Sequence, residues 1–144
     1  MSLFNPSRDQ VRQFFFHTWQ QFNQQKILSD LEKIALEVIQ MHPEYHTILK
    51  NPAQFSQQEY FPEMGETNPF LHMSLHLSAI EQIGINQPIG ISQIYETLKT
   101  KHRDAHKAQH DLLDCLAETL WQAQRNQQPL DAEHYLTLLN NKLT

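Results

Sequence analysis

The chain is poor in the residues that build disulfides, nucleotide-binding loops and membrane segments. Cys115 is its one cysteine, which excludes an internal disulfide and suits a reducing compartment. It has only three glycines, and the phosphate-binding patterns G-x-G-x-x-G and G-x-x-x-x-G-K do not occur. No run approaches the ~20 apolar residues of a transmembrane helix, and "MSLFNPSRDQ" lacks the apolar stretch of a signal peptide. These absences predict a cytoplasmic protein that does not enter a membrane.

Positive charge is also sparse. The 11 Lys and Arg residues are outnumbered by 16 Asp and Glu residues, and they are scattered rather than massed. A surface for nucleic acid or anionic lipid needs clustered basic residues, so we expect neither partner. A protein partner, a second copy of the chain and a small-molecule substrate all remain open.

Apolar residues recur at helical spacing along nearly the whole chain, and no segment alternates with the period of a strand. Two capping boxes, Ser7 with Gln10 and Ser29 with Glu32, mark the starts of two helices. The apolar phase continues from 91 to 125, where we expect a break near Arg103. We predict an all-α single domain over 1–144, a helical bundle of about five to six helices, with 51–68 as a long loop.

What the chain has in excess is histidine at a spacing of four. Nine histidines in 144 residues would give about 0.5 such pairs by chance, yet four occur: 42/46, 72/76, 102/106 and 106/110. Residues four apart on a helix are neighbours, so their imidazoles are close enough to share one metal ion.

At 100° per residue, five of these histidines fall on the predicted apolar faces of three helices. They are His42, His72, His76, His106 and His110. His17 and His134 fall on polar or border faces, and Cys115 falls off the apolar face of its helix. The inward histidines predict a shared polar pocket inside the bundle.

We interpret this pocket as a site for one divalent transition metal, with Zn or Fe as the expected ion, because imidazole suits these metals. The predicted ligands are His72, His76, His106 and His110. His42 is a further contributor, and Asp114 is a ligand or a residue that orients one of the imidazoles. A metal-activated water for hydrolysis is the most economical reaction, with His46 or Glu44 as the general base.

Established metal-site patterns fit to different degrees. The zinc-protease motif H-E-x-x-H is absent because Met73 stands at the glutamate position of "HMSLH", and no E-x-x-H of the ferritin-like di-iron proteins occurs. The pair His110–Asp111 is superficially similar to the helical HD phosphohydrolases. His42 with one H-x-x-x-H pair looks more like the three-histidine site of DinB-like helical bundles.

Almost the whole chain resembles a bacterial family known as the domain of unknown function numbered 1841. The resemblance rests on "FNPSRDQVRQFFFHTW", "IALEVIQMHPEYH", "TNPFLHMSLHLSAIEQ" and "DAHKAQHDLLDCLAETLWQAQR". It implies a small intracellular bacterial protein and brings no established reaction, so no catalytic residue carries over from it.

The alternative hypothesis is a non-enzymatic helical adaptor in which the histidines form a structural polar network. Its glutamine-rich segments "WQQFNQQ" and "WQAQRNQQ" would make contact surfaces without strong charge. The two hypotheses differ in whether the protein retains a stoichiometric metal ion.

Overall fold

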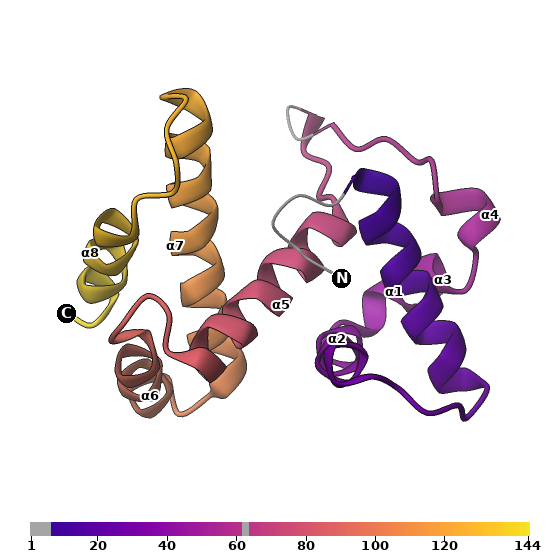
Figure 1. Cartoon of the computed structure of the whole chain (residues 1–144), viewed down its shortest axis with the longest axis horizontal. Helices are drawn as coiled ribbons and strands as arrows, with labels where there is room; N and C mark the ends of the chain where they lie inside the picture. Colours follow the sequence, from indigo (N-terminus) through magenta and orange to yellow (C-terminus); the bar gives the residue numbers. More distant parts are fainter. Residues whose placement is uncertain (1–6, 62–63) are drawn as a thin grey trace. The chain divides into compact units, whose positions relative to one another are not determined.

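The computed structural model describes residues 7–61 and 64–144, and these residues form helices, turns and loops without a strand (Figure 1). The helices are α1 (Arg8–Asn23), α2 (Asp30–Gln40), the 3₁₀ turn η1 (Pro43–Tyr45), α3 (His46–Leu49), α4 (Pro52–Phe55), α5 (Pro69–Ile85), α6 (Ile91–His102), α7 (Ala105–Arg125) and α8 (Ala132–Lys142). The all-α class is confirmed.

The predicted count of five to six helices is too low for the described part of the chain, which has eight α-helices. Two of them, α3 and α4, have four residues each, too few for an apolar stripe to reveal. α4 also lies within 51–68, so this segment is not a continuous loop; Pro52 starts the helix at its first position. Expectations for 1–6 and 62–63 lie outside the described residues.

Side-chain caps explain where the long helices begin. Both predicted capping boxes form: Ser7 with Gln10 on α1, and Ser29 with Glu32 on α2. At the start of α5, Asn68 Oδ1 accepts hydrogen bonds from the backbone N–H groups of Phe70 and Leu71, at 3.0 and 3.2 Å. Each cap satisfies donors that the first turn of a helix leaves without an intrahelical partner.

The predicted break near Arg103 is confirmed. Arg103 ends α6 with a left-handed backbone (φ +56°), which prevents the helix from continuing. Asp104 then caps α7 by accepting hydrogen bonds from the backbone N–H groups of His106 and Lys107. One apolar pattern from 91 to 125 therefore covers two helices.

The chain forms two compact units, Met1–Leu77 and Ser78–Thr144, and α5 runs from the first into the second. In the first unit, α1 packs against α2 and α3; in the second, α7 packs against both α6 and α8 (Figure 1). The prediction of a single domain stays a prediction. Among the described residues, no helix combines the length and the apolar character needed to cross a bilayer.

The buried face of α1 differs from the one that helical spacing predicts, which contains Val11, Phe14, Phe15, Thr18, Trp19 and Phe22. Phe15 and Trp19 are buried as expected, but Phe22 is exposed and Arg12 is fully buried. The sequence pattern placed this face about one residue away because a charged side chain was not expected inside. Arg12 contacts both the segment after α4 and the first turn of α5, the helix that carries His72 and His76.

Replacing Asn68 with Ala should lower the free energy of unfolding by about 1 kcal/mol, because two N–H groups at the start of α5 lose their acceptor. Chemical denaturation followed by far-ultraviolet circular dichroism measures this change. Asn140→Ala, at an exposed position of α8, should change the same free energy by less than about 0.5 kcal/mol. Equal effects of the two substitutions would contradict the capping role.

Candidate metal centre

The first unit places two histidines at the end of α2, where the last carbonyl groups of the helix need donors. The His42 Nδ1–H group donates to the Val38 carbonyl at 2.8 Å, and His46 Nε2–H donates to the Ile39 carbonyl at 2.9 Å. The 42/46 pair therefore does not lie on one helix. Both residues fold back onto α2 from the segment that follows it.

The bond to Val38 determines which nitrogen of His42 is available. A carbonyl oxygen only accepts, so Nδ1 carries the hydrogen, and Nε2 of neutral His42 is the nitrogen that carries the lone pair. Histidines that bind metals commonly donate their other ring N–H to a backbone carbonyl in this way, which fixes the tautomer and the ring plane. His42 is 3% exposed, so its Nε2 is held in a largely dry environment.

α5 brings two further imidazoles to the same place. His72 and His76 lie one helical turn apart, and their ring nitrogens and that of His42 all lie within 4.8 Å of one another. Nε2 of His72 is 3.0 Å from Nε2 of His42. The His42 ring meets those of His72 and His76 edge-on, with centroids 4.7 and 5.2 Å apart. His76 is fully buried and His72 is half-buried.

These separations are close to those around a metal ion. With metal–nitrogen bonds of ~2.05 Å, two nitrogens 3.0 Å apart subtend about 94° at the ion. Two such bonds span at most ~4.1 Å, so a pair separated by the full 4.8 Å needs to close by at least about 0.7 Å. A three-histidine site therefore requires side-chain rotations that bring the ring nitrogens closer together.

Tyr45 is a neighbour of this cluster that the sequence analysis missed. Its ring stacks on His42 with centroids 5.3 Å apart and planes 9° from parallel, and lies edge-on to His72 at 6.2 Å. Burial raises the pKa of the Tyr45 phenol, and the Glu44 carboxylate adds to this effect. The sequence signal that could have identified Tyr45 was Pro43. It starts a 3₁₀ turn, in which residues three apart, such as His42 and Tyr45, lie above one another.

The two predicted general bases lie in the segment that follows His42 but differ in availability. Nε2 of His46 is used by the Ile39 carbonyl, and its ring packs on Trp19 with centroids 4.4 Å apart. Only Nδ1 of His46 is left for proton transfer. Glu44 is exposed on η1, two residues after His42.

The second unit holds the other predicted ligands on α7. His106 and His110 are half-buried, and their rings are 4.1 Å apart. With His106 set at 0°, the fully buried positions Ala108, Leu112 and Thr119 lie at about 200°, 240° and 220°. The histidine pair therefore lies on the opposite side of α7 from these three positions. Asp114 is exposed.

The histidine–aspartate pair of α7 does not act as a unit. Asp111 Oδ2 lies 2.6 Å from Nε2 of His102, at the end of α6, and both side chains are partly buried. Asp111 therefore joins α6 to α7 across the break at Arg103. This contact gives Asp111 a structural role as a link between two helices of the second unit.

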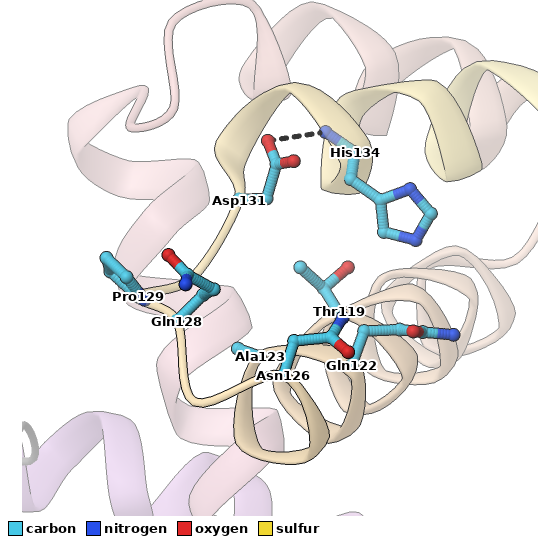
Figure 2. A pocket seen from close by; sticks show the side chains of 8 residues that line it. All are labelled: Thr119, Gln122, Ala123, Asn126, Gln128, Pro129, Asp131 and His134. Atoms are coloured by element: carbon cyan, nitrogen blue, oxygen red, sulfur yellow. Dashed lines mark hydrogen bonds between the residues drawn. The ribbon is translucent and has the colours of Figure 1, made fainter.

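His17 and His134, which the sequence pattern places on polar or border faces, are not among the clustered histidines. His17 is exposed and lies 3.5 Å from Glu32. His134 lines a pocket of about 320 Å³ between the end of α7 and the start of α8, shown in Figure 2. Several polar groups of this pocket already bond within the protein: Thr119 to the Cys115 carbonyl, and Asp131 to the His134 backbone N–H.

Comparison with known families identifies one family that matches the chain. The family described as Domain of unknown function (DUF1841) matches residues 7–141. The chain belongs to this family. No curated protein and no solved structure matches the chain.

Cys115 corrects one predicted orientation. The thiol was expected off the apolar face of its helix, but it is buried on the side of α7 that also buries Leu112 and Thr119. The error arose because α7 packs against two helices, so its buried arc is centred elsewhere than a single stripe of leucines suggests. Burial raises the pKa of the thiol to about 11.

The Cys115 thiol should therefore be unreactive in the native protein. At pH 8 a thiol with this pKa is about 0.1% thiolate, and its sulfur is covered. Because its pKa is raised on folding, its contribution to stability is fully present below the unfolded value of ~8.5 and is lost as the pH rises to about 11. A colorimetric disulfide reagent should titrate one thiol in denaturant and almost none without it; rapid native labelling would contradict this burial.

Proposed function

We propose that the first unit binds one divalent transition metal ion through His42, His72 and His76. The observation that carries the proposal is the orientation of His42. Its Nδ1–H group is used by the Val38 carbonyl, so its Nε2 lone pair is directed at His72, 3.0 Å away. Three imidazoles supplied by two separate elements, α5 and the segment after α2, then converge within 4.8 Å.

The chemistry of the clustered side chains supports an ion at this place. A single divalent cation can bind several imidazole nitrogens together, and the ring nitrogens of His42, His72 and His76 lie within 4.8 Å of one another. Three neutral nitrogen ligands suit zinc or iron, the ions expected from the sequence, and also nickel and copper. The cluster matches the combination of His42 with one H-x-x-x-H pair that looked similar to DinB-like bundles.

Three protein ligands leave at least one coordination position open. If water takes it, a zinc ion lowers the pKa of that water to ~7 and provides hydroxide for hydrolysis. Glu44 and Nδ1 of His46 are the nearby groups proposed to receive its proton. The contribution of His106 and His110 to the same ion, expected from their spacing, stays a prediction.

The rival proposal, a structural polar network, rests on the same 3.0 Å contact. Without a metal, His72 Nε2–H donates to the bare Nε2 of His42, and the chain Val38–His42–His72 is an ordinary hydrogen-bonded relay. Both proposals require the same tautomer of His42. They differ in whether Nε2 of His72 carries a hydrogen or a metal ion.

Protein purified without a histidine tag should bind about one equivalent of Zn²⁺ or Co²⁺, measured by elemental analysis and calorimetry. His42→Ala and His76→Ala should each weaken binding by tenfold or more, since each removes one of three ligands. A chelator should lower the melting temperature of wild type, because binding to the native state alone adds to its stability.

Two sets of controls separate the alternatives. His17→Ala removes an exposed histidine of the same unit and should leave metal affinity unchanged. A structural network instead predicts that His42→Ala and His76→Ala destabilise a protein that never held metal. Loss of stability with no metal bound to wild type would overturn the metal proposal.

The α7 pair has its own test. His110→Ala should weaken Co²⁺ binding and alter the visible absorption of the bound ion if α7 supplies a fourth ligand, because the coordination number changes. His134→Ala, on α8, is the matched control in the second unit. An unchanged spectrum in His110→Ala would restrict the site to His42, His72 and His76.

A further inference from the structure

Arg12 is the largest fully buried side chain among the described residues, and it is 1% exposed. Its Nη1 atom donates to the carbonyl groups of Phe55, Ser56 and Gln58, at 3.3, 3.0 and 2.7 Å. These carbonyls belong to the last residue of α4 and the segment after it. The guanidinium therefore attaches that segment to α1.

The same guanidinium also contacts the start of α5. Its Cζ atom lies 4.8 Å from the centroid of the Phe70 ring and 5.6 Å from that of Tyr60, which are cation–π distances. Phe70 packs edge-on against Phe16 of α1 as well, with centroids 5.4 Å apart. The first turn of α5 is thus held on α1 by one charged and one aromatic side chain.

The positive charge of Arg12 is surrounded by backbone carbonyl groups and aromatic rings in place of a carboxylate. Within the described part of the chain, no carboxylate lies within ion-pair distance of it. Burial lowers the pKa of Arg12, and the nearby Arg8 lowers it further, but an arginine remains protonated at neutral pH. A buried cation without a carboxylate is costly unless carbonyl dipoles and aromatic faces replace water around it, as they do here.

The position of Phe70 links this contact to the histidines. Phe70 precedes His72 by two residues on the same rigid helix, and His42 is fixed independently by the end of α2. The separation of His42 and His72 therefore depends on where the first turn of α5 is held. A shift of that turn by one ångström would break a 3.0 Å contact between nitrogens.

We propose that Arg12 is a positioning residue for the histidine cluster: it clamps the segment after α4 and the first turn of α5 onto α1, and so places His72 against His42. The part of this inference that concerns metal affinity rests on the function proposed above. The part that concerns the His42–His72 contact does not.

Arg12→Met tests the clamp, because methionine fills part of the space but donates no hydrogen bond. Nitrogen-15 spectra of the metal-free imidazoles report which ring nitrogens carry hydrogen. Wild type should show the signature of a bond between Nε2 of His72 and Nε2 of His42, and Arg12→Met should lose it. Co²⁺ affinity should fall tenfold or more, about 1.4 kcal/mol, with a changed visible spectrum.

Arg8→Met is the matched control. Arg8 lies one turn earlier on α1 and also reaches the segment after α4, through Gln57 Oε1 at 3.0 Å, but it is exposed. This variant should keep the imidazole signals and the Co²⁺ affinity of wild type. Arg12→Lys, which restores a charge and a donor without the flat guanidinium, should recover part of both.

If Arg12→Met does not fold, Arg12→Lys and Phe70→Leu replace it. Phe70→Leu leaves the three carbonyl bonds and removes the aromatic surface beside the guanidinium. Wild-type imidazole signals in both variants would overturn the inference. So would a variant that melts earlier yet binds Co²⁺ with unchanged affinity and spectrum, since that result makes Arg12 merely structural.

The two proposals fail separately. If wild type binds no metal but Arg12→Met loses the His42–His72 signal, the metal proposal is wrong and the positioning role stands. If wild type and Arg12→Met bind metal alike, the positioning role is wrong and the metal site stands.

Discussion

The hydrogen bond from His42 to the Val38 carbonyl is the constraint on which the histidine cluster depends. The last carbonyl groups of a helix have no donor within the helix. In α2, one such donor is the side chain of His42, which lies beyond the end of the helix. The bond satisfies α2, and it also selects one tautomer of His42. A local requirement of backbone structure thereby produces a directed nitrogen lone pair, which is what metal binding and a hydrogen-bonded relay both need.

The second requirement is that α5 is positioned so that His72 and His76 lie next to His42. Their spacing of four residues ensures that both face the same way, but spacing does not determine where the helix lies. That position comes from the contacts of Phe70 with Phe16 and Arg12 on α1. The cluster therefore combines one element fixed by capping with another fixed by packing.

Periodicity and capping rules predicted much of this architecture because they act over a few residues. The boxes at Ser7 and Ser29 and the break at Arg103 are all local events. The inward placement of His42, His72 and His76 followed from the same counting.

Errors arose where long-range packing decides the outcome. α7 is covered on two sides, so the buried positions of Cys115 and Thr119 do not follow from its leucines. Arg12 was overlooked because its charge argued against burial, and only the carbonyls of a distant segment make that burial tolerable. Tyr45 joined the cluster through a 3₁₀ turn that apolar periodicity does not detect.

The burial of Cys115 has a practical consequence for following this protein in solution. Since it is the one cysteine in the chain and its sulfur is covered, the surface offers no native thiol for modification. A cysteine introduced at an exposed position, such as Ile27 in the first unit or Ile89 in the second, would be the sole accessible attachment point for a fluorophore or spin label. Selective labelling of either unit therefore requires no cysteine-free background.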